Sequence, residues 1–450
     1  MKTGTSMGEL ARLRYPDGML IPFRADQLEM VADTQKQITA GSQTLFEATF
    51  LAEETLVKVD ILTKLPGQAG WHLIEVKSSR RVKKEHIGDA AIQAYILHKS
   101  GLKIGKVSIL HVNEAYRFPD EEELFKLTEV SDAVHTALLS IPAELDIQRN
   151  VLEQPMPPDI PLGRYCLRPE KCPFFDHCWQ DIKKPTIYTI NNLHKNRELE
   201  LQNLNVFYLE DIPRDFPLSP KQRKQVDRIN KKRVEVDQNS MQDKLNRLRF
   251  PIYFFDFETI NPALPWVDGM ASFEHMPFQF SLHILYEDGT LEHGEYLHLD
   301  RSDPHEPLAQ SIIDQIGESG SIVVYHAAFE KRVLTALAER LPHFAERLLN
   351  MADRLWDLEK IFLEDYFHHR FLGKSSIKVV LPVLVPNLSY AGLAVQNGAE
   401  AQIAWLDMVD TPFGDEKEQK IEDLKAYCWQ DTIAMVEIYR HLLGTVNSKQ

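Results

Sequence analysis

The chain has 450 residues, of which 44% are hydrophobic and 26% are charged, a composition typical of soluble globular proteins with two or three separate cores. Because it has no apolar run of membrane-spanning length and no signal-peptide pattern at its start, we expect a cytoplasmic protein. The formal net charge of -15 argues against a protein that coats nucleic acid, although an enzyme can still handle nucleic acid through a local basic patch and metal ions.

Residues 44 to about 116 alternate strand-like and helical patterns, which predicts an α/β unit within a first domain at 1–185. Strands are expected at 46–50, 55–62, 71–78 and 106–112, and helices at 25–38, 84–99 and 120–140. A Pro-rich segment at 155–161 then leads into three cysteines, and we take it as the margin of this domain.

Two of these strands carry a pattern of charged residues that suits metal chemistry. Asp60 lies near the end of one strand, and Glu75 and Lys77 point to the same side of the next because side chains alternate. The two acids can hold Mg²⁺, and the lysine can polarise a water or stabilise charge on a phosphate. A half-buried strand with a surface Glu/Lys pair is the more common origin of Glu-x-Lys alone. Asp60 on a separate strand, and the following helix with Gln93 and Tyr95, favour the metal site.

This pattern resembles the core of PD-(D/E)xK nucleases, in particular the RecB-like branch that includes the CRISPR adaptation nucleases. The resemblance implies metal binding and catalysis by Asp60 and Glu75, catalysis by Lys77, and nucleic-acid binding by Gln93 and Tyr95, whose spacing is compressed relative to the family. An upstream acid or histidine usually completes the metal site in this branch, and we expect Glu47 in that position.

Three of the four cysteines, Cys166, Cys172 and Cys178, form a cluster with two five-residue gaps, whereas Cys428 stands alone. In a cytoplasmic chain such a cluster is more often a metal or iron–sulfur site than a disulfide framework. The RecB-like branch often binds an iron–sulfur cluster through one upstream and three downstream cysteines, which implies a [4Fe–4S] cluster here, although the upstream cysteine is missing. Zinc bound by the three cysteines and His177 is an alternative, and three buried thiols without metal are another.

The helical pattern of residues 186–249 predicts a helical connector, and this segment is rich in lysine and arginine. A charge run is usually a solvated helix face, yet in an acidic protein it is also the best candidate for a strip that contacts phosphates. The residues that we expect to bind nucleic acid there are Lys221, Arg223 and Lys224.

From residue 250 onward a second α/β pattern begins. Its strands are expected at 253–259, 280–286, 291–299 and 322–325, and its helices directly after 325, at 344–367 and at 417–443.

Four acids of this second half break the local hydrophobic pattern. Asp256 and Glu258 point to the same side of a buried strand, and Glu330 and Asp431 fall on the apolar stripes of two helices. A buried carboxylate is costly unless it is paired or metal-bound. Any one of them could be a capped or salt-bridged core acid, but four together favour two hard cations, with Tyr427, one turn before Asp431, orienting the attacking water.

The segments Asp-Phe-Glu-Thr (256–259), Tyr-His-Ala-Ala-Phe-Glu (325–330) and Tyr-Cys-Trp-Gln-Asp (427–431) resemble, in order and spacing, the motifs of DnaQ-like 3′–5′ exonucleases with an RNase H-like fold. The second motif usually ends in Asp, so Glu330 is a departure that is one methylene longer. The resemblance implies two Mg²⁺ or Mn²⁺ ions and catalytic roles for Asp256, Glu258, Glu330, Asp431 and Tyr427.

The combination of the two domains resembles a bacterial family that is described only as a domain of unknown function. In that family a RecB-like nuclease precedes a DnaQ-like exonuclease. The segment 373–390 looks like a signature of the second half of that family. Its Ser/Lys-rich turn, with Lys374, could meet a phosphate at a helix N-terminus, and a plain helix cap explains the same turn equally well.

The sequence therefore predicts an α/β protein with a restriction-endonuclease-like domain at 1–185, a helical basic connector at 186–249, and an RNase H-like mixed sheet flanked by helices at 250–450. The expected function is metal-dependent hydrolysis of DNA phosphodiester bonds, with a 3′–5′ exonuclease in the second domain and another nuclease site in the first. We expect DNA that is single-stranded or has free ends as the partner, in repair, recombination or phage defence, and no membrane partner. The alternatives are an RNA exonuclease and a non-catalytic nucleic-acid-binding subunit of a repair or defence complex.

Overall fold

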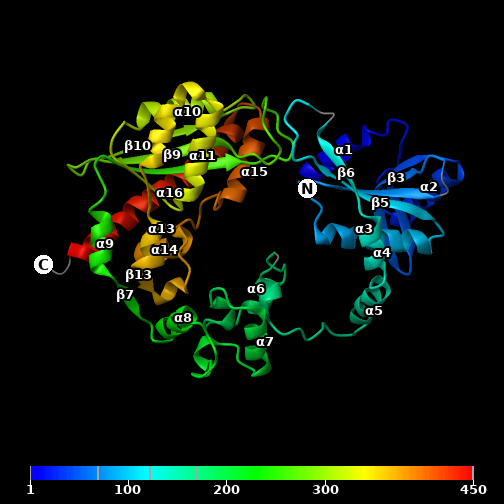
Figure 1. The fold of residues 1–450 in the computed structure, drawn as a ribbon, viewed down its shortest axis with the longest axis horizontal. Helices are drawn as coiled ribbons and strands as arrows, with labels where there is room; N and C mark the ends of the chain where they lie inside the picture. The colour runs from blue at the N-terminus through cyan, green and yellow to red at the C-terminus, as the bar shows by residue number, and fades with distance from the viewer. Residues whose placement is uncertain (1, 68–69, 121–122, 169, 448–450) are drawn as a thin grey trace. The chain divides into compact units, whose positions relative to one another are not determined.

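The computed structural model describes residues 2–67, 70–120, 123–168 and 170–447, which form two compact units (Figure 1). The N-terminal unit comprises Met1–Asp159 together with Asn261–Glu274, and the C-terminal unit comprises Ile160–Ile260 together with His275–Gln450. Within the described part of the chain, none of the helices combines the length and the apolar character that crossing a membrane requires.

The N-terminal unit is built on a six-stranded mixed sheet in the order β1-β2-β3-β4-β5-β6. Its strands are β1 (Met19–Leu20), β2 (Thr44–Ala52), β3 (Thr55–Lys64), β4 (Trp71–Lys77), β5 (Ile104–Val112) and β6 (Phe125–Glu129), and its helices are α1 (Lys2–Arg12), α2 (Gln27–Thr39), α3 (Lys84–Lys99), α4 (Ser131–Leu138) and α5 (Ile141–Leu152). β4 and β5 are parallel, and α3 forms the crossover that parallel neighbours require.

Apolar side chains cover both faces of this sheet. Along β4, Leu73 packs with α3 in one core, whereas Ile74 and Val76 belong to the other core, beside α1. Because side chains alternate along a strand, Glu75 and Lys77 share the α3 side with Leu73. The sheet therefore places these two charged residues next to the crossover helix.

The C-terminal unit contains a five-stranded sheet in the order β10-β9-β8-β11-β12. Its strands are β8 (Ile252–Ile260), β9 (Met276–Leu285), β10 (Leu291–Leu297), β11 (Ser321–Val324) and β12 (Leu355–Asp357), and its helices are α10 (His305–Gln315), α11 (Ala327–Arg340), α12 (Ala345–Asp353), α13 (Glu359–Glu364), α14 (Ile377–Leu384), α15 (Gly398–Asp410) and α16 (Asp415–Asn447). β8, β9 and β10 are antiparallel neighbours, whereas β11 is parallel to both β8 and β12. The mixed α/β fold expected from the sequence is therefore observed.

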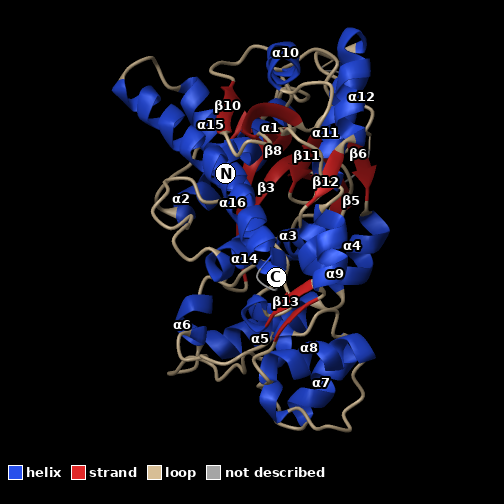
Figure 2. Ribbon diagram, turned by 90° about the vertical axis from the view of Figure 1, so that its left-hand side faces the viewer, coloured by secondary structure: helices blue, strands red, loops and turns tan. Residues whose placement is uncertain are grey.

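The central strand β8 is buried on both faces, which explains its nearly continuous apolar sequence. Phe255 and Phe257 belong to the core with α10, α11 and α12, and Phe254 to the core with α13, α14 and α16. Asp256 and Glu258 share the face of Phe254, since side chains alternate. The long helix α16, which Figure 2 shows crossing this unit, packs on β8 and β9 on that face.

The segment expected to be a connector folds onto the C-terminal unit. It contains α6 (Phe175–Trp179), α7 (Lys195–Asn203), α8 (Pro220–Asn230), β7 (Val234–Val236) and α9 (Gln238–Leu245). β7 pairs with β13 (Tyr366–His368), and α9 packs on α16. The three clustered cysteines also fall in this unit, because its contacts begin at Ile160 rather than at the expected boundary of 185.

Two expected helices differ from the structure. The range 120–140 contains β6 at the edge of the sheet and then α4, and the range 344–367 is divided into α12, β12, α13 and the first residues of β13. Helical periodicity continues through the short strands in sequence, but pairing of β6 with β5 and of β12 with β11 fixes these residues as strands. Tertiary pairing thus overrides the local pattern.

The segment Asn261–Glu274, which follows β8 in the chain, belongs to the N-terminal unit. Phe118 N donates to Met270 O at 3.0 Å, and Gly269 N donates to Phe118 O at 2.8 Å. The strand that carries Asp256 and Glu258 is therefore followed directly by a segment that packs in the other unit.

Candidate metal centre

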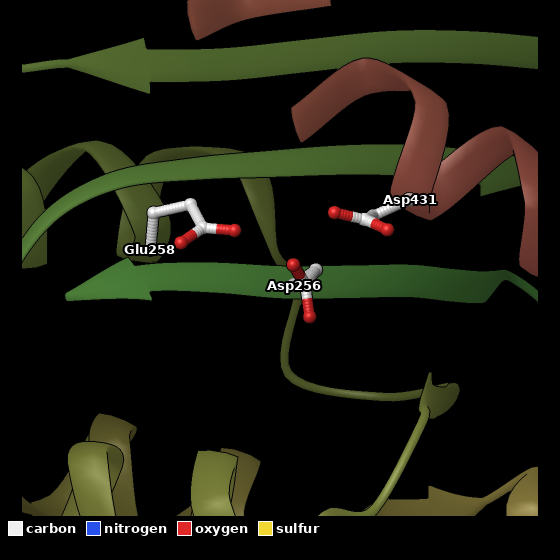
Figure 3. A group of neighbouring side chains, drawn as sticks. All are labelled: Asp256, Glu258 and Asp431. Atoms are coloured by element: carbon white, nitrogen blue, oxygen red, sulfur yellow. The ribbon is translucent and has the colours of Figure 1, made fainter. Parts of the chain in front are cut away.

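Three of the four expected acids of the C-terminal unit lie together. Asp256 and Glu258 come from β8 and Asp431 comes from α16, and each offers a carboxylate oxygen within 4.8 Å of those of the other two (Figure 3). Alternation along β8 directs the first two acids toward α16, and the buried stripe of α16 directs Asp431 back toward the strand. We call these three residues the acid triad.

Burial raises the pKa of each carboxyl group in the acid triad, and neighbouring acids raise that of Asp256 and Glu258 further. Burial, then the charge of Asp431, raises the pKa of Glu258 to about 8, and burial raises that of Asp431 to about 6. The pKa of Asp256 is raised well above its usual range by burial and by the neighbouring acids. Within the described residues, no Lys, Arg or His nitrogen forms an ion pair with the triad, so the chain does not neutralise it by direct contact.

Hydroxyl groups and one lysine surround the acid triad. Tyr390 Oη donates a hydrogen bond to Asp431 Oδ1 at 2.6 Å, and a hydrogen bond from Tyr427 lowers the pKa of both Glu258 and Asp431. Lys378 Nζ lies 5.3 Å from the ring centroid of Tyr390 and 5.4 Å from that of Tyr427. Its charge lowers the pKa of all three acids without touching them, which offsets only part of their repulsion.

The acid triad opens into a cavity of about 510 Å³. All three acids line it, and so do Tyr427, Lys378 and several apolar and aromatic side chains, including Phe257, Phe329, Ile377 and Met435. A ligand therefore has access to the carboxylates, which a set of acids sealed in a core would not allow. Ligand sites commonly combine such an apolar wall with a few converging polar groups.

Glu330 does not join this group. It lies on α11 and is buried, but it neither lines the cavity nor belongs to the acid triad. Its Oε2 has no hydrogen-bond partner, and burial, assisted by the charge of Asp357, raises its pKa to about 8. Its charge reaches Asp256 and raises the pKa of that acid, so Glu330 lies near the triad. Its role as a fourth metal ligand stays a prediction.

A second polar cluster lies beside the cavity. His326 adopts a left-handed backbone conformation with φ at 75°, and its amide donates to Asp357 Oδ1 at 3.1 Å. The ring Nδ1 of His326 lies 3.1 Å from Glu359 Oε2, and Ser375 Oγ donates to Glu359 Oε1 at 2.7 Å. His326 and Glu359 both line the cavity. In the sequence, the one signal for this cluster was that His326 lies inside the second motif. In the structure, its positive φ supports a functional role, because such angles at non-glycine residues often mark functional positions.

Lys378 and Tyr390 are the other residues at the site that the sequence did not single out. They lie within the segment 373–390, whose expected contact residue was Lys374. Lys374 lies before α14, is exposed and does not line the cavity, whereas Lys378, four residues later on α14, does. Spacing on α14 could have suggested Lys378, but its closeness to the acids depends on how α14 packs on α16.

In the N-terminal unit, Asp60, Glu75 and Lys77 also lie together. Lys77 Nζ lies 2.9 Å from Glu75 Oε1 and 2.7 Å from Asp89 Oδ2, and Gln93 Nε2 donates to Glu75 Oε2 at 2.7 Å. The amide of Val76, between the two charged residues, donates to Asp60 Oδ2 at 2.7 Å. Burial, then the charge of Glu75, raises the pKa of Asp60 to about 7.

The remaining expected residues of this unit lie elsewhere or are engaged by other groups. Glu47 is close enough to raise the pKa of Asp60, but its carboxylate forms an ion pair with Arg12 at 2.8 Å. Tyr95 Oη donates to Glu53 Oε2 at 2.8 Å. Gln93 and Tyr95 diverge because residues two apart on a helix do not face the same side. Of the pair, Gln93 alone reaches the acids, and it holds Glu75 in place.

The three clustered cysteines are unbridged, and they range from buried Cys166 through half-buried Cys172 to exposed Cys178. Over the described ranges, their sulfur atoms and the exposed His177 do not gather at the spacing of ligands to a single ion. The amide of Cys172 donates to the carbonyl of Cys166 at 3.0 Å, which forms a tight loop. The zinc and iron–sulfur alternatives both stay predictions.

The basic residues expected to bind nucleic acid on α8 divide into two groups. Arg223 donates to the carbonyl oxygen of Pro213 at 3.3 Å and to that of Phe216, so its guanidinium is used inside the fold. Lys221 and Lys224 are exposed. Their role in binding nucleic acid stays a prediction.

Comparisons with known proteins add relatives of unknown function. The chain is 27% identical over 220 residues to "Uncharacterized protein UU173" of Ureaplasma parvum, 26% over 223 residues to "Uncharacterized protein MG366" of Mycoplasma genitalium, and 29% over 232 residues to its homolog in Mycoplasma pneumoniae. The alignments cover 44%, 44% and 46% of this chain but only 32%, 33% and 34% of the relatives, so the chain matches about a third of their length.

A family model matches part of the C-terminal unit. The matched range 253–376 includes Asp256, Glu258 and Glu330 and ends before Lys378 and Asp431. Residues 253–376 of this chain are thus similar to the family described as "Domain of unknown function (DUF2779)".

Proposed function

We propose that this protein is a metal-dependent nuclease whose principal active site is the acid triad. The observation that carries the proposal is the gathering of three buried carboxylates within 4.8 Å, open to a cavity and not paired with a cation in the described residues. Like charges at this spacing repel one another unless they are protonated or bind a positive ion. An all-oxygen donor set favours the hard cations Mg²⁺ and Mn²⁺.

The acid triad would hold such ions, which when bound activate a water and stabilise the leaving oxygen of a phosphodiester. Burial and the nearby acids raise the pKa of Tyr427, so its hydroxyl stays protonated and acts as a hydrogen-bond donor rather than as a base. Tyr390 fixes one oxygen of Asp431. Lys378, exposed above both tyrosine rings at the cavity, provides a positive charge that suits a substrate phosphate.

The fold supports a more specific proposal for each unit. A mixed sheet with two acids on its central strand, and a third on a C-terminal helix, supports a DnaQ-like 3′–5′ exonuclease with an RNase H-like fold. In the N-terminal unit, Asp60, Glu75 and Lys77 around a β4-α3-β5 crossover support a second nuclease site of the PD-(D/E)xK type. We propose DNA as the substrate and keep RNA as the alternative. For the segment with the three cysteines, we propose a [4Fe–4S] cluster as the bound cofactor.

The proposal is tested with Asp256→Asn, Asp60→Asn and the double variant. Degradation of end-labelled single-stranded DNA and of RNA of the same sequence is measured with and without Mn²⁺. We expect Asp256→Asn to remove stepwise shortening from the 3′ end, and the double variant to remove all Mn²⁺-dependent cleavage. Full activity in the double variant would refute the proposed function. A preference for the RNA substrate would select the alternative substrate class.

A further inference from the structure

A basic and aromatic groove lies in the C-terminal unit, separate from the cavity of the acid triad. Its volume is about 550 Å³, and it lies where the segment after α6 meets the end of α8 and the turn after β13. Its cationic and aromatic lining residues are Trp179, Lys183, Lys184, Lys232, His369 and Arg370. No Asp or Glu among the described residues lines it, although the whole chain carries a net charge of -15.

The cations of this groove are not all used by the fold. Lys184 pairs with Glu210 at 2.5 Å, and Lys183 Nζ donates to the carbonyl oxygen of Gln180 at 2.6 Å. The exposed side chains of Lys232 and Arg370 have no ion-pair partner in the part of the chain that the structure describes. Two unpaired cations facing one groove favour a ligand with more than one negative charge.

Aromatic rings form the rest of the wall. Trp179 stacks on Phe175 with ring centroids 5.0 Å apart, and His369 stacks on His368 at 4.6 Å, so both rings are held in fixed planes. Trp179 Nε1 and His369 Nδ1 are buried without a hydrogen-bond partner, and unsatisfied polar atoms of this kind are uncommon in a wall that serves only packing. Single-stranded nucleic acids bind where cations track the backbone and flat rings accept the bases.

The groove is connected to the acid cavity through a short and well-anchored segment. Leu372 lines the groove and Ser376 lines the cavity, and a chain of four residues spans at most about 14 Å. Gln225 Nε2 donates to Leu372 O at 3.2 Å and to Thr189 O at 3.0 Å, which ties this turn to the opposite wall of the groove. The two sites are therefore close and fixed relative to each other, within reach of one short strand.

We propose that this groove binds the phosphodiester backbone of a single-stranded nucleic acid and leads the strand to the acid triad. Lys232 and Arg370 contact phosphates, and the rings of Trp179 and His369 lie against bases. The identity of the ligand rests on the proposed function, whereas the positive charge and the aromatic wall of the groove do not. Since a phosphate backbone is common to DNA and RNA, the groove binds both.

The test compares the unaltered 450-residue chain with the variant Lys232→Gln/Arg370→Gln. Binding to a fluorescently labelled single-stranded oligonucleotide, as DNA and as RNA, is followed by anisotropy in EDTA over a range of salt concentrations. Loss of two phosphate contacts reduces the slope of log K against log[salt] by about 1.4 for a single strand, and we expect about 10-fold to 100-fold weaker binding at low salt. The control Lys331→Gln/Lys360→Gln removes two exposed lysines of the same unit that line neither site.

A groove variant that binds both oligonucleotides with the affinity and salt slope of the control would overturn the proposal. Hydrolysis of a small phosphodiester, a nitrophenyl ester of a nucleotide, provides a second measurement. It involves no strand, so the groove variant should keep the kcat of the unaltered chain while its KM for a long strand rises. If the groove variant binds more weakly but the unaltered chain shows no nuclease activity at all, the groove proposal stands and the proposed function is rejected.

Discussion

The two acid clusters of this protein differ in whether a cation of the chain pairs with their buried carboxylates. In the N-terminal unit, one carboxylate oxygen of Glu75 forms an ion pair with Lys77, and the other accepts a hydrogen bond from Gln93. In the C-terminal unit, tyrosines donate hydrogen bonds to the acid triad, and Lys378 lies over their rings without forming an ion pair with a carboxylate. The chain thus supplies an ion-pair partner to Glu75, whereas among the described residues it supplies none to the acid triad.

This difference indicates which cluster depends on an added cation. Three carboxylates that the chain does not neutralise must hold protons or bind a positive ion, so a divalent ion has most to gain at the acid triad. At Glu75 an ion would have to displace Lys77 or bind beside it. We therefore expect the chemistry and the metal dependence of stability to follow the C-terminal unit more closely.

The largest expected effect concerns activity. Removing an outer contact of a metal ligand typically costs about 10-fold to 100-fold, so loss of a ligand through Asp431→Asn should lower kcat for stepwise shortening from the 3′ end by at least about 100-fold. The matched control is Glu422→Gln, which removes an exposed acid from the same helix. Equal kcat values for the two variants, measured on end-labelled DNA with Mn²⁺, would place catalysis outside the acid triad.

Stability should change in opposite directions in the two clusters. In metal-free protein at pH 8, Glu258→Gln removes a source of repulsion and should raise the melting temperature of the C-terminal unit. Glu75→Gln removes one of the two acids paired with Lys77 and should lower the melting temperature of the N-terminal unit by roughly 5 °C, since a hydrogen bond to a charged group contributes about 2 kcal/mol. Thermal unfolding followed by circular dichroism in EDTA checks both signs. Destabilisation by Glu258→Gln in EDTA would show that the triad is not under repulsion.

The pH dependence follows from the raised pKa values. The pKa of Glu258 rises from 4.5 in its ordinary state to about 8 in the folded chain, and that of Asp431 from 3.8 to about 6. Between these values the folded chain holds protons that the unfolded chain has released, so stability is highest at low pH and falls as pH rises through this window. Urea unfolding in EDTA from about pH 5 to about pH 8 should show this fall, and Mn²⁺ should reverse it. Rising stability in EDTA over the same window would contradict the raised pKa values.

The smallest expected effect is that of Lys378→Met. It removes a charge that lies above the tyrosines but contacts no carboxylate, so we expect kcat to fall by about 10-fold, a loss near 1.4 kcal/mol, while Mn²⁺ still binds. The control is Lys331→Met, an exposed lysine on α11 that does not line the cavity. Complete loss of Mn²⁺ binding in Lys378→Met would instead assign this lysine to the integrity of the site.

Local patterns predicted much of the candidate site. The i, i+2 spacing of Asp256 and Glu258 and the apolar stripe around Asp431 each describe one element, and the structure joins them because α16 packs on β8. Glu330 also lies on a buried stripe, as expected, but its carboxylate does not join the others. A stripe predicts that a side chain is buried, whereas the direction of the carboxylate depends on the rotamer and the tertiary packing.

The parts that the sequence did not predict depend on contacts between distant segments. Lys378 and Tyr390 reach the acids only after the segment around α14 packs on α16, and His326 meets Glu359 through the parallel pairing of β11 and β12. From the sequence, the basic connector was expected to be a separate helical segment. In the structure its strand β7 pairs with β13, and the connector and the turn after β13 together line the groove that contains Lys232. Periodicity within one element carries no information on such pairings.

Binding of divalent cations by the acid triad can be measured by calorimetric titration of the 450-residue chain with Mn²⁺. We predict Mn²⁺ uptake by the unaltered chain, loss of only the smaller share that the N-terminal unit contributes in Asp60→Asn, and loss of the larger share of the heat in Asp256→Asn/Asp431→Asn. Circular dichroism verifies that each variant is folded. Undiminished uptake by a folded Asp256→Asn/Asp431→Asn chain would contradict the claim.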